Sequence, residues 1–125
     1  MCVAVLAKRM GMTVFSSSRS KSKEATLKNI GVDHVLVDDG NLAKQVRNIL
    51  PDGVDCAIEL IGTPTLPDTL KSVKVKGTVC FTGMLSNIWT VKEFYPIGTA
   101  YSLSSHVHFL SPALSIEYLP TGVRL

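Results

Sequence analysis

The feature that most constrains the fold is a regular alternation of short apolar runs with helix-like segments. Strand-like runs rich in β-branched residues are expected at 12–15, 32–37, 54–61 and 78–82, and helices at 2–10, 21–29, 42–50 and 65–73. The connections are short and carry turn residues such as Pro51-Asp52-Gly53. The run at 54–61 is almost continuously apolar, which is typical of a parallel strand covered on both faces. The alternation therefore predicts an α/β fold, a parallel sheet with right-handed crossover helices.

Composition narrows the class of protein further. The chain has 125 residues, 46% of them hydrophobic and 18% charged, which favours one folded domain over a disordered segment. A net charge of +3, with no aromatic residues among the cations, argues against nucleic-acid binding. No apolar run approaches the roughly 20 residues that span a bilayer. The widely spaced Cys2, Cys56 and Cys80 argue against a disulfide framework and predict a reducing, cytoplasmic location.

The segment 12–23, MTVFSSSRSKSK, leads from an apolar strand directly into hydroxyl and cationic side chains. Its cations are Arg19, Lys21 and Lys23, and Lys28 follows about one helical turn later. In a dinucleotide-binding fold, the end of the second strand meets the adenosine ribose, where a carboxylate binds the 2′-hydroxyl of NAD and an arginine accommodates the 2′-phosphate of NADP. If the fold is of this type, the segment indicates NADP. The alternative is a solvated, charged loop.

Three other features invite a functional interpretation, and a structural one is favoured for each. Glu59 lies within an apolar strand, so it is expected to reach a hydrogen-bond partner near the strand's carboxyl end. Asp38-Asp39, followed by Gly40, is explained by a turn. The pair His106-x-His108 could share one face of an extended segment, but no nearby cysteine or carboxylate run completes a metal site. We therefore predict no metal ligand in this chain.

Several consecutive segments resemble one known family in their order and spacing. They are LAKRMGMTVFSSSRS, LKNIGVDHVLVDDG, VDCAIELIGTPTLPDTLKSVKVKGTVCFTGMLSN, WTVKEFYPIG and YLPTGVRL. Together they cover about four-fifths of the chain and resemble the cofactor domain of the medium-chain dehydrogenase/reductase superfamily. The likeness is strongest to its quinone oxidoreductase-like branch, also described as zinc-type alcohol dehydrogenase-like. The resemblance implies a Rossmann fold, a doubly wound parallel sheet.

The resemblance also implies an activity and a set of site residues. The activity is that of an NADPH-dependent oxidoreductase, often homodimeric, that transfers hydride to a small-molecule quinone, enone or aldehyde without zinc. The residues matching the grip on the 2′-phosphate are Ser18, Arg19 and Lys23. The residues matching the loops after the fourth and fifth strands, near the nicotinamide, are Ile61, Gly62, Thr63, Thr82, Gly83 and Met84. No catalytic side chain is predicted, and neither nucleic acid nor membrane is an expected partner.

The chain departs from the family pattern at its beginning. The family's amino-terminal catalytic domain, its first Rossmann strand and the glycine-rich turn G-x-G-x-x-G have no counterpart in this sequence. That strand is central in the order 3-2-1-4-5-6, so its absence exposes one edge of strand 12–15 and one edge of strand 54–61. We therefore expect marginal stability, re-pairing of these two strands, or self-association.

A second departure lies near the carboxyl end of the chain. Removal of 99–117 would join PIG directly to YLPTGVRL and restore the family pattern. The sequence thus predicts a partial NADP-binding Rossmann domain over 1–98, an irregular insertion over 99–117, for which a retained intron is one origin, and the start of the last strand over 118–125.

Two other functions stay open on the sequence alone. The chain could be a non-catalytic remnant or a truncated gene product that binds nucleotide weakly or not at all. A small flavodoxin-like nucleotide or regulatory domain also fits the alternation, but it needs its own phosphate loop after a first strand, and the sequence has none. Tight binding of NADPH by the purified chain would exclude the remnant.

Overall fold

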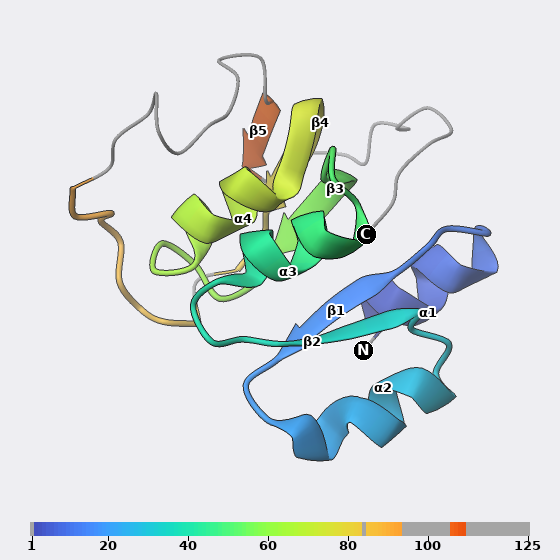
Figure 1. Ribbon diagram of the computed structural model, residues 1–125. Coiled ribbons are helices and arrows are strands. Elements are labelled where there is room, and N and C mark those ends of the chain that lie inside the picture. The colour runs from blue at the N-terminus through green and yellow to red at the C-terminus, as the bar shows by residue number, and fades with distance from the viewer. Residues whose placement is uncertain (1, 84, 94–105, 110–125) are drawn as a thin grey trace.

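The computed structural model describes residues 2–83, 85–93 and 106–109, drawn in colour in Figure 1. The described elements are α1 (Cys2–Arg9), β1 (Phe15–Ser18), the 3₁₀ helix η1 (Lys21–Lys23), α2 (Glu24–Asn29), β2 (His34–Val37), α3 (Leu42–Ile49), β3 (Val54–Glu59), α4 (Leu66–Ser72), β4 (Val73–Phe81) and β5 (His106–Phe109). Every described strand pair is parallel, which confirms the predicted α/β fold.

Two strands differ from the sequence-based expectation. β1 lies three residues beyond 12–15, because its serines pair with the β-branched and aliphatic residues of β2, as in Ser16↔Val35 and Ser17↔Leu36. This tertiary pairing overrides the low strand propensity of serine. β4 begins at Val73, directly after α4, so the lysine-rich connection expected at 74–77 belongs to the strand. The register shifts between Val54, which pairs with Val73, and Cys56, which pairs with Thr78, and this irregularity accommodates the additional residues of β4.

The strands form two separate sheets, β1-β2 and β3-β4-β5. The expected re-pairing of the strand at 12–15 with the strand at 54–61 is therefore wrong for the described residues, because β1 and β3 share no ladder. Side-chain packing holds the two sheets together instead. One core cluster contains Leu36 of β2, Val46 of α3 and Val54 of β3, with further residues of α4 and β4. Helix α3 thus joins the two sheets, and α4 lies beside it (Figure 1).

The caps and turns explain where the helices begin. The Ser20 side chain accepts a hydrogen bond from the Ser22 amide at the start of η1 and so caps it. Asn41 precedes α3 but makes no side-chain cap; the Ala43 amide instead donates to Asp68 of α4 at 3.2 Å. Asp38 accepts from the Gly40 amide at 3.2 Å, which confirms the turn interpretation of the paired aspartates.

The segment 99–117, expected to be irregular, contains β5. The structure describes His106–Phe109 of this segment, and these residues pair in parallel with the outer edge of β4, in the register Thr78↔His106 to Phe81↔Phe109. Valine and phenylalanine favour extended backbone, and the edge of β4 offers unpaired amides and carbonyls. The rest of 99–117, and all of 118–125, lie outside the described residues.

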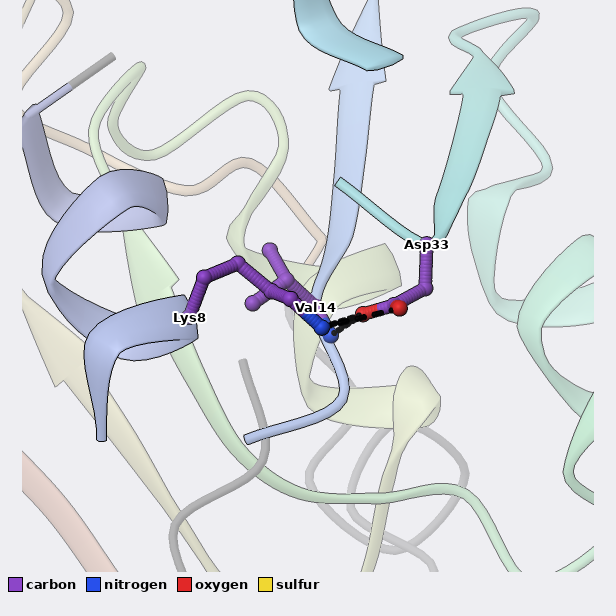
Figure 2. Close-up of polar contacts among 3 residues, drawn as sticks. All are labelled: Lys8, Val14 and Asp33. Atoms are coloured by element: carbon purple, nitrogen blue, oxygen red, sulfur yellow. Dashed lines mark hydrogen bonds and ion pairs between the residues drawn. The ribbon is translucent and has the colours of Figure 1, made fainter. Parts of the chain in front are cut away.

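A polar contact ties the end of α1 to the starts of β1 and β2 (Figure 2). Asp33 accepts a hydrogen bond from the Val14 amide at 2.7 Å, and Lys8 donates to both of its carboxylate oxygens at 2.9 and 3.0 Å. The Val14 amide, and secondly the Lys8 ammonium, lower the pKa of the Asp33 carboxyl. The carboxylate therefore satisfies the amide of a residue that is only 1% exposed.

Asp33→Asn should reduce stability at neutral pH by about 1 kcal/mol, since it weakens one charge-assisted hydrogen bond and a partly solvated ion pair. Because the folded pKa lies below the ordinary value of 3.8, the Asp33 contribution is complete above that value and is lost as the pH falls through the folded pKa. Urea unfolding at pH 7, 5 and 3 should show the wild-type advantage shrinking only at the lowest pH. An advantage that is the same at all three values would contradict the role of the charge.

Candidate functional site

The buried carboxylate of Glu59 organises the loop after β3. Glu59 is 4% exposed, and its Oε1 accepts hydrogen bonds from the Ile61 amide at 2.8 Å and the Gly62 amide at 3.0 Å. The Thr65 hydroxyl donates to the same oxygen at 2.8 Å, and the Thr69 hydroxyl donates to Oε2 at 2.5 Å. These four donors replace the hydration that burial removes, and they confirm the expected hydrogen-bond partners near the strand's carboxyl end.

The two threonines of this network were missed by the sequence analysis. Thr65 precedes α4 and Thr69 lies one turn later, and the i, i+4 spacing places both hydroxyls on one face of the helix. A buried acid at the end of a strand, followed by two hydroxyl residues at this spacing, is the signal that could have found them.

The loop after β4 lies directly against the loop after β3. The amides of Thr82 and Gly83 both donate to the Glu59 carbonyl, at 3.0 and 3.2 Å. A Cβ atom on Gly83 would lie 2.2 Å from the Leu60 carbonyl oxygen, so only glycine permits this approach. The structure therefore brings together two groups of predicted cofactor-binding residues, 61–63 and 82–83. Met84 lies outside the described residues.

Only some of the predicted cofactor-binding residues in these two loops are exposed. Gly62 and Thr63 are buried, and the Thr63 hydroxyl is committed to the Ile88 carbonyl oxygen at 2.5 Å. Ile61 is 39% exposed, and Thr82 is also exposed. An incoming ligand would thus meet the Ile61 side chain and Thr82, whereas the buried Gly62 and Thr63 pack inside the loop.

The third predicted group lies at the end of β1. Ser18 is the last residue of the strand, and its hydroxyl donates to the Ser20 carbonyl at 3.0 Å. Arg19 and Lys23 are exposed, and neither forms an ion pair within the described ranges. By contrast, Lys28 pairs with Glu24 at 2.8 Å, and its hydrogen bond lowers the pKa of that carboxyl. The end of β1 thus presents Arg19 and Lys23 without an ion pair to any described carboxylate.

A cleft of about 270 Å³ lies between β1 and β3, and we call it the β1–β3 cleft. Its walls come from β1, β3 and the loop after β3, with residues of α1 on one side and of α3 on the other. Ser17, next to the cationic end of β1, and Ile61, in the loop after β3, both line it. No direct contact between the cations and the two loops is present among the described residues.

Cys56 and Cys80 are suited to packing and not to nucleophilic chemistry. Cys56 is 4% exposed, and burial raises the pKa of its thiol to about 11. Burial also raises the pKa of the Cys80 thiol. Since the thiolate is the nucleophile and the metal ligand, both groups are inert at neutral pH. Within the ranges that the structure describes, no three histidine, cysteine or acidic side chains gather to hold a metal ion.

None of the described helices is both long and apolar enough to cross a membrane.

The sequence matches the zinc-binding dehydrogenase family over residues 1–109. It is 33% identical over 78 residues to a probable quinone oxidoreductase of Leishmania amazonensis, a match that covers 62% of this chain and 23% of the relative. The chain thus spans about a quarter of the length of this curated relative.

Two solved structures illustrate the likeness in fold. The crystal structure of AibC is 31% identical, with a TM-score of 0.76, over 85% of this chain and 29% of AibC. Escherichia coli quinone oxidoreductase complexed with NADPH is 17% identical, with a TM-score of 0.72, over 86% of this chain and 33% of that enzyme. The second match shows the fold alone. Because the family match extends over most of its length, this chain belongs to the zinc-binding dehydrogenase family of the medium-chain dehydrogenase/reductase superfamily, and it corresponds to part of the Rossmann cofactor domain.

Proposed function

We propose that the chain provides the NADPH-binding surface of an oxidoreductase that transfers hydride to a quinone, an enone or an aldehyde. The observation that carries the proposal is the exposed pair Arg19 and Lys23 at the end of β1, which form no ion pair with a described residue. In a Rossmann fold this is the place where an arginine accommodates the 2′-phosphate. The names of similar proteins, a probable quinone oxidoreductase and an NADPH complex, agree with this cofactor and substrate class.

The residues of this chain would bind and orient the cofactor, and the bound cofactor would supply the hydride. Ser18, Arg19 and Lys23 hold the 2′-phosphate. Ile61 and Thr82 face the nicotinamide half, on loops that Glu59 and Gly83 keep closely packed. This arrangement requires no zinc ligand from the described residues.

The location and assembly of the protein are further parts of the proposal. The free thiols of Cys2, Cys56 and Cys80 support a reducing compartment, which we propose is the cytoplasm. Homodimer formation rests on the family resemblance alone, and analytical ultracentrifugation would test it.

Arg19→Glu should separate the two nicotinamide cofactors. We expect it to weaken NADPH binding about 30- to 150-fold, the loss of a hydrogen bond to a charged group of about 2–3 kcal/mol, and to leave NADH binding nearly unchanged. Titration calorimetry of the chain with each cofactor gives the measurement. Lys76→Glu, an equal charge change at an exposed position of β4, is the matched control.

The same titration decides between the alternatives. Equal losses for both cofactors in Arg19→Glu would remove the 2′-phosphate role from Arg19. If the wild-type chain binds neither cofactor at millimolar concentration, the non-catalytic remnant becomes the better description of the chain as it stands.

A further inference from the structure

Serines and cations are interleaved where β1 leads into η1. The segment 16–23 reads SSSRSKSK, so its last serines are each flanked by basic residues. The only carboxylate before Asp33 in the sequence is Glu24, and its side chain is paired with Lys28 at 2.8 Å. A serine among cations matches the acidic substrate groove of one class of protein kinase, because charge patterns of this kind set the specificity of kinases for their substrates.

The hydrogen bonds distinguish Ser22 from the serines before it. The Ser18 hydroxyl donates to the Ser20 carbonyl at 3.0 Å, so its proton is in use. The Ser20 hydroxyl oxygen caps η1, since it accepts from the Ser22 amide at 3.2 Å. The Ser22 hydroxyl lies 2.8 Å from the Ser20 hydroxyl, and it is not the oxygen that forms the cap. A group attached to Ser22 therefore leaves the cap in place.

The backbone at Ser22 can reach the extended form in which a kinase holds its acceptor. The turn η1 contains no buried residue, and all of 19–23 is exposed. Its hydrogen bond from the Lys23 amide to the Ser20 carbonyl is long, at 3.4 Å. A short 3₁₀ turn with few buried contacts opens at low cost. The serines of β1, by contrast, are held in the ladder with β2.

We propose that Ser22 is phosphorylated by a protein kinase that selects basic substrates, and that the phosphate pairs with Arg19 and Lys23 in place of the 2′-phosphate of NADPH. In this step the Ser22 oxygen forms a bond to the γ-phosphorus of ATP, and the bond from that phosphorus to the β,γ-bridging oxygen breaks. ADP leaves with the electron pair, and the hydroxyl proton passes to the catalytic base of the kinase. The effect on the cofactor rests on the function proposed for Arg19 and Lys23, whereas the modification itself does not.

A phosphate on Ser22 has an advantage over the cofactor in binding these cations. Phosphoserine carries a charge of about −1.5 to −2 at neutral pH and three strong acceptor oxygens. Ser22 lies three residues after Arg19 and directly before Lys23, so both long side chains are near it along the chain. Because the phosphate is tethered, it competes with the 2′-phosphate at a high effective concentration. The modified chain should reject NADPH and keep its affinity for NADH, whose ribose carries a free 2′-hydroxyl.

The first experiment measures whether the folded chain is a kinase substrate. The full 125-residue chain and its Ser22→Ala variant are incubated with ATP and a serine kinase that reads an arginine three residues before the acceptor, and mass spectrometry locates the phosphate. We expect phosphate on Ser22 in the wild type and little incorporation in Ser22→Ala. Phosphate mainly on another serine, or no incorporation into the folded chain, would overturn the site.

The second experiment measures the pairing without any nucleotide. Phosphoserine is installed at position 22 during translation, and phosphorus NMR follows its second ionisation. Neighbouring cations favour the dianion, so its pKa should lie below the ordinary value of about 6 and should rise when Arg19→Gln and Lys23→Gln are combined. Lys21 and Glu24, the other charged groups of this turn, are the same in both chains. An unchanged pKa would overturn the pairing.

The third experiment measures the effect on the cofactor by titration calorimetry. Phosphoserine at position 22 should weaken NADPH binding about tenfold or more and change NADH binding by less than about threefold. Phosphoserine in place of Asn48, which is exposed on α3, adds the same charge elsewhere and should bind NADPH as the unmodified chain does. Equal losses at both positions would overturn the competition. If the unmodified chain binds no NADPH, the proposed function fails, and the phosphorus NMR measurement still tests the pairing.

Discussion

Glu59→Ala should lower the free energy of unfolding by about 3–5 kcal/mol. The substitution leaves two loop amides and two threonine hydroxyls without their acceptor, and each buried, unsatisfied polar group costs about 1–3 kcal/mol. The hydroxyls can rotate toward other acceptors, but the amides of Ile61 and Gly62 cannot. Since a domain of this size is stable by about 5–15 kcal/mol, this one change removes a large part of the total.

Glu59→Gln is the matched control for the carboxylate. Its carbonyl oxygen can still accept from the Ile61 and Gly62 amides and from Thr65, whereas its amide group meets the Thr69 hydroxyl. We expect a loss of about 1–2 kcal/mol, measured by urea unfolding under the same conditions. Equal losses for the alanine and glutamine variants would show that the loop does not depend on the acceptor oxygen.

Gly83→Ala should be the second most damaging change, at about 2–3 kcal/mol. The added Cβ would lie 2.2 Å from the Leu60 carbonyl oxygen and 2.8 Å from the Leu60 carbonyl carbon. Both are backbone atoms, so the clash cannot be relieved by rotating a side chain. The two loops must separate, and the hydrogen bond from the Gly83 amide to the Glu59 carbonyl is lost.

Gly40→Ala separates this clash from a general effect of replacing glycine. Gly40 has a φ of 84°, but nothing lies within 4 Å of an added Cβ. It should therefore show only the cost of an unfavourable backbone conformation, about 1 kcal/mol. Thermal and urea unfolding of both variants give the comparison. If Gly83→Ala is no worse than Gly40→Ala, the close approach of the loops at Leu60 is not needed for stability.

The sequence could predict the features that depend on local pattern. The apolar run from Val54 requires a buried strand, and a carboxylate within it requires donors nearby, so the role of Glu59 followed from its surroundings. Ser20 directly before the helical residues of η1 is likewise a local signal for a helix cap. These arguments involve residues close together in the chain, where the hydrophobic periodicity and the turn residues indicate the local structure.

Features that depend on distant contacts could not be predicted. The serines of β1 become a strand only because β2 pairs with them, and Asp68 replaces Asn41 as the cap of α3 from 25 residues away. The commitment of the Thr63 hydroxyl to the Ile88 carbonyl likewise depends on how two loops fold over one another.

The separation of β1 from β3 bears on how the chain loses its order. The two described sheets share no ladder, so apolar packing around α3 and the hydrogen bonds from Gln45 of α3 to the Val37 carbonyl and the Asp39 carboxylate hold them together. Cooperative units in a protein follow such boundaries, and one half can open while the other stays intact. We therefore expect the β1-β2 half, which carries Arg19 and Lys23, to open as a unit. A nucleotide that contacts both halves would then stabilise the closed arrangement, and its observed affinity would be reduced by the free energy needed to hold the two halves together.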